Sequence, residues 1–223
     1  MMKLRAHNKC AVTAFSVLLS LAALAGGRGA ALAQEAAPRN EAPQIEVEAE
    51  NPASDAGDLA NQGSLSARME RWFAELADPD YAGWARAQTD IEREWSKSGS
   101  AAMDLLLMRG ELSLDEGDLA GAIDDLTALT DHAPEFPAGF AARGVAFYMA
   151  GEHGPALADL AQAVALEPRQ FAALAVIGQI FEEMRQDARA IAAYEASLAL
   201  NPHQADVSDA IARLKKTQEG IAL

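Results

Sequence analysis

The side chains that could carry out acid–base or metal chemistry are scattered along the 223-residue chain. Beyond the N-terminal region, single histidines stand at expected turns and helix ends, with no second histidine or acid in H-E-x-x-H spacing: His132, His153 and His203. Adjacent acids such as Glu182-Glu183 are common, but consecutive residues of a helix do not face each other. We therefore expect solvated surface groups, with no catalytic residue and no metal site.

Motifs for other reaction chemistry are also missing from the sequence. It has no G-x-S-x-G elbow, no phosphate-binding P-loop and no G-x-G-x-x-G turn. The one cysteine, Cys10, precedes an apolar run that we expect to be removed, so the mature chain has no disulfide, no thiolate metal site and no cysteine nucleophile. The sequence thus favours a protein that is not an enzyme and needs no cofactor.

The first 33 residues have the organisation of a secretory signal peptide. A basic start and an apolar run, residues 11–25, precede an A-x-A site that ends at Ala33. The run has 15 residues, whereas a membrane-spanning helix needs about 20. We expect cleavage after Ala33, and an uncleaved membrane anchor is the alternative. Arg28, between the apolar run and the cleavage site, fits the signal pattern least well.

Charge and cysteine usage limit the compartment and the partners. The formal net charge is −15, and it becomes −19 in the mature chain because the signal segment holds four basic residues and no acid. Such an acidic chain repels nucleic-acid phosphates and anionic membranes and favours basic partners. The mature part has no cysteine, no Asn-X-Ser/Thr site and no lipid-attachment site. We therefore predict a periplasmic protein that does not insert into the membrane after cleavage.

Two segments precede the most regular part of the sequence. Residues 34–63 hold seven acids, three prolines and almost no large apolar residues, which predicts a disordered acidic linker because little surface can be buried. A helical hairpin is expected at 64–100, where apolar residues recur at helical spacing on both sides of Asp78-Pro79-Asp80.

Three stretches of 34 residues then repeat one pattern: 103–136, 137–170 and 171–204. Numbered from the start of each stretch, position 8 is always glycine, position 20 alanine and position 32 proline. Large apolar residues mostly fill positions 4, 11 and 24, which predicts a core between two helices that approach closely at the glycine and the alanine. Proline stops the second helix. One such hairpin cannot bury its apolar face alone, so the repeats must stack.

Glycine, alanine and proline at this period resemble the tetratricopeptide repeat (TPR), over 102 residues of the chain. The resemblance implies an all-α solenoid of helical hairpins. Departures are Ser113, where an aromatic residue is usual, and Arg109 and Arg143 at position 7, which is usually apolar. We interpret the hairpin at 64–100 as a degenerate repeat or an N-terminal cap, and residues 205–219 as the capping helix with which such arrays commonly end.

The resemblance also implies a concave groove, lined by positions 2, 5, 9, 12 and 13 of each repeat, that holds an extended or helical peptide. Our candidates for groove residues are Leu107, Glu111, Ala141, Val145, Tyr148, Met149, Gln179 and Glu182. No Lys, Arg or Asn occurs at the groove positions, unlike in carboxylate-clamp TPRs, which grip the C-terminal acids of chaperone partners. The apolar middle and acidic flanks predict a partner with an apolar anchor and basic neighbours.

We therefore interpret the chain as an exported, non-enzymatic protein that mediates protein–protein interaction as a scaffold or adaptor in the cell envelope. The alternative is a self-associating envelope protein whose groove is plugged by its own N-terminal segment or by a second copy. A third class, an enzyme accessory domain, would need a catalytic neighbour that this chain does not carry. An adaptor is expected to be monomeric with an open groove, and a self-associating protein to have at least twice that mass.

Overall fold

The computed structural model describes residues 52–221, and the side chains of residues 63–218. The predicted signal peptide, its cleavage site and most of the predicted linker lie outside this range. The described residues form helices and no strands: α1 (Pro52–Ala77), α2 (Trp84–Trp95), α3 (Ala101–Glu116), α4 (Leu119–His132), α5 (Pro137–Met149), α6 (His153–Leu166), α7 (Phe171–Glu183), α8 (Asp187–Leu200) and α9 (Ala205–Ile221). No helix among them combines the length and the apolar character that spanning a bilayer requires.

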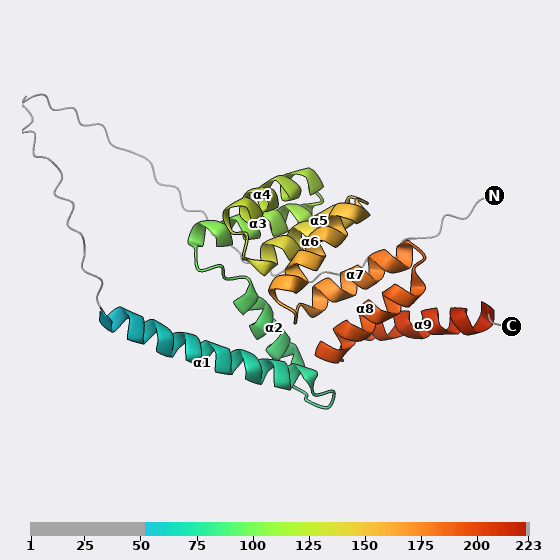
Figure 1. The fold of residues 1–223 in the computed structure, drawn as a ribbon, viewed down its shortest axis with the longest axis horizontal. Coiled ribbons are helices and arrows are strands. Elements are labelled where there is room, and N and C mark those ends of the chain that lie inside the picture. Colours follow the sequence, from blue (N-terminus) through green and yellow to red (C-terminus); the bar gives the residue numbers. More distant parts are fainter. Residues whose placement is uncertain (1–51, 222–223) are drawn as a thin grey trace, which may run out of the picture. The chain divides into compact units, whose positions relative to one another are not determined.

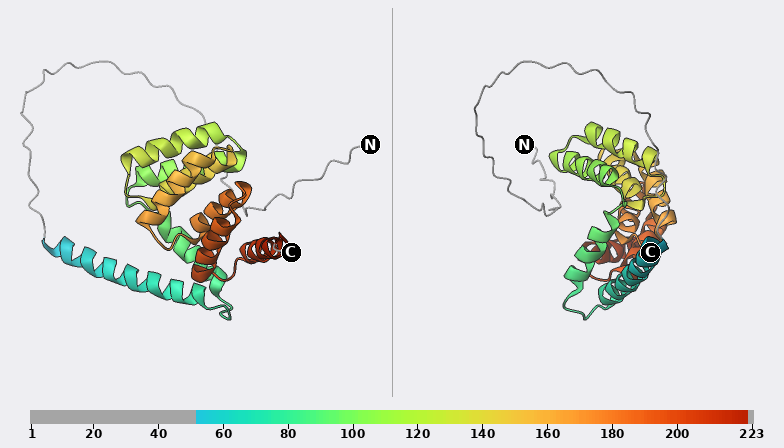
Figure 2. Two further views of the ribbon diagram at one scale, coloured as in Figure 1. Left: turned by 45° about the vertical axis from the view of Figure 1, so that its right-hand side comes forward. Right: turned by 90° about the vertical axis from the view of Figure 1, so that its left-hand side faces the viewer.

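Each predicted 34-residue repeat corresponds to one pair of packed helices. The pairs α3–α4, α5–α6 and α7–α8 lie side by side in chain order (Figure 1). In the right-hand view of Figure 2 the three pairs follow a curve, and the first helices of neighbouring pairs are in contact. The all-α solenoid expected from the sequence is therefore confirmed.

Position 8 is glycine because the two helices of each pair leave no room there for a side chain. A Cβ atom at Gly144 would lie 2.7 Å from Cγ of Leu160. At Gly110 it would lie 2.5 Å from Cγ of Leu126, and at Gly178 2.4 Å from Cδ1 of Tyr194. Real Cβ atoms do not approach other atoms this closely, so a larger residue would push the helices apart. The same contact occurs between positions 8 and 24 in all three repeats.

The arginines at position 7, unusual for the repeat, pair with aspartates at position 23. Nε and Nη2 of Arg143 donate to the Asp159 carboxylate at 2.7 and 2.9 Å, and Nη1 donates to Oγ1 of Thr130 at 2.6 Å. The hydrogen bonds to Asp159 raise the pKa of Arg143, although partial burial opposes the shift. In the first repeat, Nη2 of Arg109 lies 2.9 Å from Oδ1 of Asp125. Each pair ties together the two helices of one repeat.

Helix α1 begins at Pro52, twelve residues before the start expected at residue 64. The prediction of a disordered linker is therefore wrong for residues 52–63. Proline suits the first position of a helix, because its missing N–H has no partner there, and acids in the first turns suit the helix dipole. Asp55 and Asp58 provide such acids, and alanines at 53, 56 and 60 favour the helix. The prediction gave too much importance to the missing large apolar residues.

The hairpin α1–α2 does not stack on α3 as a preceding repeat would. Its buried residues Phe73, Leu76 and Ile91 share a core with Phe171 at the start of α7. Its polar contacts reach the end of the second repeat, where Arg169 Nη1 pairs with Glu70 at 2.8 Å, and the third repeat, where Asn201 Nδ2 donates to Gln88 at 3.1 Å. The expected hairpin is present, but its neighbours are the ends of α6, α7 and α8, and in Figure 2 α2 lies on the inner side of the curve.

Helix α9 covers the open side of the last repeat. Its apolar residues Val207, Ala210, Ile211 and Leu214 are buried in one core with Phe181, Ile191 and Tyr194. The residues on its other side, including Lys215 and Lys216, are exposed. The arrangement is that of a capping helix: an apolar inner face on the array and a polar outer face.

Candidate binding surface

Six of the eight candidate groove residues line two hollows that follow one another along α5 and α7. Glu111, Ala141 and Val145 line one of them, with a volume of about 330 Å³. Tyr148, Gln179 and Glu182 line the other, with a volume of about 700 Å³. We call them the apolar pocket and the acidic pocket. Because Val145 and Tyr148 are one helical turn apart on α5, the two pockets form a continuous candidate surface.

The other two candidates do not line either pocket. Leu107 is 2% exposed and belongs to the core of the first repeat, with Leu126 and Leu129 of α4, so its prediction as a groove residue is wrong. The same core includes Ala146 of α5, and position 5 of the third repeat, Ala175, is also buried. Met149 is exposed, at the last residue of α5, away from both pockets.

Small and branched side chains make the apolar pocket. Alanines 138, 141 and 142 and Val145 come from α5, while Phe171 and Val176 come from α7. Alanine at these positions leaves space between the two helices that a larger residue would fill. The pocket can hold one apolar side chain of a partner, because its lining offers dispersion contacts and no competing charge at its centre.

Two acids border the apolar pocket, Glu92 from α2 and Glu111 from α3. Partial desolvation raises the pKa of both carboxyl groups, and at Glu111 the neighbouring Asp115 raises it further. A partly desolvated carboxylate is stabilised when a cation approaches. The border of the pocket therefore favours a basic group beside an apolar anchor.

Helix α2 supplies residues of this pocket that the sequence did not reveal. The ring of Trp95 packs against Phe73 at 5.7 Å and Phe171 at 5.6 Å, measured between ring centroids. Its indole N–H is buried and has no hydrogen-bond acceptor among the described residues. No sequence signal could identify Trp95 or Glu92 as pocket residues, since the repeat period begins only after the hairpin.

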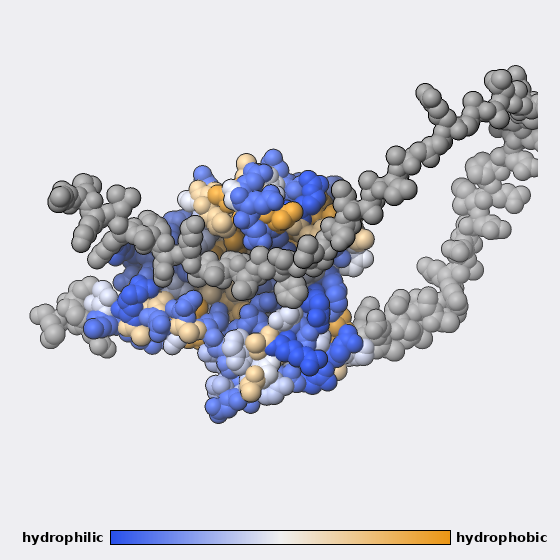
Figure 3. Space-filling view, turned by 180° about the vertical axis from the view of Figure 1, so that it is seen from behind, coloured by the Kyte–Doolittle hydropathy of each residue, from blue (hydrophilic) through white to orange (hydrophobic). Residues whose placement is uncertain are grey.

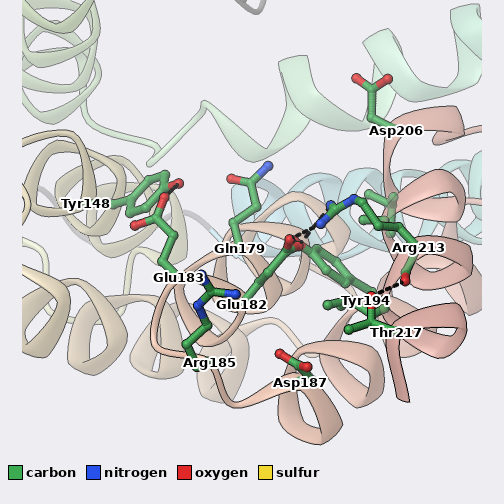
Figure 4. A pocket seen from close by; sticks show the side chains of 13 residues that line it. Tyr148, Gln179, Glu182, Glu183, Arg185, Asp187, Tyr194, Asp206, Arg213 and Thr217 are labelled. Atoms are coloured by element: carbon green, nitrogen blue, oxygen red, sulfur yellow. Dashed lines mark hydrogen bonds and ion pairs between the residues drawn. The ribbon is translucent and has the colours of Figure 1, made fainter. Parts of the chain in front are cut away.

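The acidic pocket lies between α5, α7, α8 and α9 (Figure 4). Four carboxylates line it, from Glu182, Glu183, Asp187 and Asp206, against the two guanidinium groups of Arg185 and Arg213. Sequence reasoning included Glu182 from this set but not the α9 residues, since the last repeat alone does not show how the capping helix crosses it. The surplus of acids gives the pocket a negative potential that attracts cations.

Hydrogen bonds hold part of this pocket in place. Arg213 pairs with Glu182, and this contact lowers the pKa of the Glu182 carboxyl. The Tyr148 hydroxyl donates to Oε1 of Glu183 at 2.7 Å, and Nε2 of His153 lies 3.0 Å from the other oxygen. Desolvation, followed by the bond to Glu183, raises the pKa of Tyr148 to about 12. Tyr148 thus remains a neutral donor at physiological pH.

Two carboxylates of the acidic pocket are free of such contacts. No hydrogen bond or ion pair joins the side chain of Asp187 or Asp206 to another residue in the described part of the chain. Both stand in the first turn of a helix, α8 and α9. A Lys or Arg side chain that entered the pocket would therefore meet unpaired acids.

The face drawn in Figure 3 is largely hydrophilic, and apolar residues interrupt it in limited areas. Of the single histidines, His203 stacks on Trp84 at 4.5 Å between ring centroids, and His132 is exposed at the end of α4. Within the described residues, no three His, Cys, Asp or Glu side chains are grouped so that they could hold a metal ion.

Sequence comparison relates the chain to one characterised type of protein. No protein-family model matches it. A TPR repeat-containing protein of Rhizobium etli is 26% identical over 138 residues, which are 60% of this chain and 67% of that protein.

Several solved structures share the fold. The first TPR domain of Spaghetti (RPAP3), bound to the HSP90 peptide SRMEEVD, has a TM-score of 0.52 at 22% identity and covers 54% of this chain and 95% of that domain. The Sgt2 TPR domain of Aspergillus fumigatus has a TM-score of 0.52 at 22% identity, with coverages of 55% and 83%. MamA has a TM-score of 0.51 at 22% identity, with coverages of 63% and 80%. The helical pairs of residues 103–204 therefore have the fold of tetratricopeptide-repeat domains.

Proposed function

We propose that the surface formed by the apolar and acidic pockets binds a peptide segment of another protein. An apolar side chain of the partner occupies the apolar pocket, and a Lys or Arg nearby reaches the acidic pocket or its neighbours Glu92 and Glu111. The protein acts as a non-catalytic scaffold or adaptor. The observation that carries this proposal is the succession of the two pockets along the same two helices, α5 and α7.

The charge of the surface supports a basic partner. The TPR domain of Spaghetti was solved with a peptide, SRMEEVD, that contains three acids. Here the acidic pocket carries four carboxylates and two guanidinium groups, of which Arg213 is already paired with Glu182. An acidic peptide end would be repelled, and a basic segment would be attracted.

The α1–α2 hairpin borders the apolar pocket without filling it. Helix α2 borders the pocket through Glu92 and Trp95, yet about 330 Å³ remains. This lies in the range of pockets that accept ligands, about 300–1,000 Å³. The N-terminal hairpin therefore shapes one wall of the proposed site.

Capture of partners tests the proposal. Tagged protein is incubated with an extract of the organism that encodes it, and bound proteins are identified by mass spectrometry. Val145→Glu places a charge in the apolar pocket, and Met149→Glu, at an exposed position four residues along α5, is the matched control. A partner retained by the control and lost with Val145→Glu supports the proposal. Equal retention by both variants would contradict the assignment of the pockets as the binding site.

Export to the periplasm remains part of the proposal, supported by the signal-like residues 1–33. N-terminal sequencing of the protein isolated from its own cells tests it. A chain that begins at Gln34 and is recovered with the periplasmic fraction supports export. An uncleaved chain in the cytoplasmic fraction would contradict it.

A further inference from the structure

An exposed apolar stripe runs along α3, at the N-terminal end of the repeat array. Leu105 is 49% exposed, Met108 58% and Leu112 55%. Residues three, four and seven apart share one face of a helix, so the three side chains form a continuous surface. Exposed large apolar residues that gather in this way mark an interaction site more often than isolated ones do.

Two of the three equivalent positions in the other repeats, 3 and 10, are buried, whereas Ala142 and Val176 at position 6 are half-buried and line the apolar pocket. Leu105, Met108 and Leu112 occupy positions 3, 6 and 10. In the second repeat, position 3 is Gly139, where a Cβ would lie 3.1 Å from Cδ2 of Leu129 on α4. Position 10 is Ala146 in the second repeat and Ile180 in the third, and both are fully buried. The α3 stripe is thus the continuation of the interface that joins one repeat to the next, and no repeat among the described residues packs against it.

The N-terminal hairpin does not cover this surface. Its apolar residues, among them Phe73 and Ile91, are buried in the core that includes Phe171, and Trp84 stacks on His203. An array needs a polar outer face at each end to stay soluble. The C-terminal end has one on α9, whereas the N-terminal end presents leucine and methionine.

We propose that a second copy of this chain covers the α3 stripe in an antiparallel, twofold-symmetric contact. The spacing of the stripe suits this arrangement, since Leu105 and Leu112 lie three and four residues on either side of Met108. A twofold axis beside Met108 brings Leu105 of one copy against Leu112 of the other, and the two Met108 side chains against each other. Such a contact is self-complementary, as a twofold interface must be.

The surfaces exposed at the two ends of the array determine whether association gives a closed dimer or a filament. A filament would need a complementary apolar surface at the other end. On α9, Val207, Ala210, Ile211 and Leu214 are all buried. Among the described residues, the exposed apolar face at an end of the array is the one on α3, so we expect association to stop at two copies. Three half-exposed side chains provide less than the roughly 800 Å² per partner of a standard interface, so the dimer depends on protein concentration.

The stripe lies next to the proposed binding surface, because Glu111, which borders the apolar pocket, is three residues from Met108 on α3. The inference does not depend on the proposed function, since it rests on different residues.

Sedimentation of the full chain across a range of concentrations tests the dimer. We expect the wild type to approach twice the mass of Met108→Glu, which stays monomeric. Met184→Glu changes an exposed methionine outside the stripe and is expected to dimerise as the wild type does. A wild type that remains monomeric up to about 0.5 mM, or a dimer that persists with Met108→Glu, would overturn the proposal.

A cross-linking experiment keeps the proposal testable if Met108→Glu disturbs the helix. Met108→Cys is made with Cys10→Ser, because Cys10 is the one cysteine of the sequence. A disulfide needs Cα atoms within about 7 Å, which only a residue close to the twofold axis satisfies. We expect Met108→Cys to form a covalent dimer on mild oxidation and Met184→Cys to remain a monomer. Equal cross-linking of both would contradict the twofold contact.

Discussion

The repeat array and the N-terminal hairpin are both helical, but their positions have different causes. In the array, every repeat uses the same contact between positions 8 and 24, and each pair lies beside its neighbours in sequence. The hairpin is held by contacts across about a hundred residues, such as Glu70 with Arg169 and Gln88 with Asn201. Helices of similar kind therefore serve as a repeating scaffold in one region and as the wall of a binding pocket in the other.

The candidate site lies where helices outside the repeat pattern meet the array. The array alone provides the alanines and Val145 of the apolar pocket and the Tyr148 and Glu182 side chains of the acidic pocket. The hairpin adds Trp95 and Glu92 from the side, and α9 adds Asp206 and Arg213 at the other end. The charge and the shape of the proposed site thus depend on the elements that do not follow the repeat.

The largest effect is expected from the position-7 ion pairs of the array. Arg143→Met leaves the Asp159 carboxylate buried without its partner, and we expect a loss of about 3 kcal/mol in the free energy of unfolding. The equivalent Arg109→Met should cost less than about 1 kcal/mol, because Arg109 is 57% exposed whereas Arg143 is 17% exposed. Urea denaturation of both variants measures the difference. Equal losses of stability in the two variants would contradict the difference in burial between the Arg143 and Arg109 ion pairs.

The close contact at position 8 is the next test of the array. Gly144→Leu forces a side chain against Leu160 and is expected to cost about 1–3 kcal/mol. Gly154→Leu is the matched control, because no atom lies within 4 Å of the site of its Cβ. Thermal unfolding should show a melting temperature roughly 3–10 °C lower for Gly144→Leu. An unchanged melting temperature would contradict the assigned register of the repeats.

The attachment of the hairpin can be weakened without changing the array. His203→Ala removes the stack on Trp84 and the hydrogen-bonding contact of Nε2 with the Asp78 carbonyl at 3.1 Å. A loss of about 1 kcal/mol is expected, which would increase amide hydrogen exchange in α2 about five-fold and leave α5 unaffected. His132→Ala, at an exposed histidine of α4, should change neither. Faster exchange in α5 would show that hairpin and array are one cooperative unit.

The smallest expected effect concerns Tyr148 in the acidic pocket. Its pKa is raised from 10.0 to about 12, so the stabilisation from its neutral form is complete below pH 10 and is lost as the pH rises through 12. An alkaline titration followed by absorbance at 295 nm reports tyrosine ionisation. The transition that the Tyr148→Phe variant lacks belongs to Tyr148, and its midpoint should lie near pH 12. Glu183→Gln should lower this midpoint, because it removes the charge that opposes ionisation. A phase near 10 would mean that Tyr148 is not enclosed as the structure shows.

Periodicity made most of the fold predictable. Gly110, Gly144 and Gly178 marked the helix contacts, and the proline of each repeat stands two residues beyond the helix end. The capping helix was expected from 205 and begins there. The burial of Leu107 was not predicted, because the pattern gives a face of the helix and not its rotation against α4.

The candidate site was predictable only in part. Val145, Tyr148 and Glu182 followed from the repeat positions and line the pockets. Trp95 and Arg213 did not, since their contacts join distant segments that share no period. The pairing of Arg143 with Asp159 had a signal that was missed: arginine at position 7 and aspartate at position 23 occur together in two repeats and are both absent from the third.

Binding to an array of synthetic peptides tests the central claim, that the two pockets recognise an apolar anchor with basic neighbours. The peptides share one apolar residue and differ in its flanks, which are lysine, glutamine or glutamate. The account predicts binding to the lysine-flanked peptides, weakened by salt and lost with Val145→Glu. Equal or stronger binding to the glutamate-flanked peptides would contradict it.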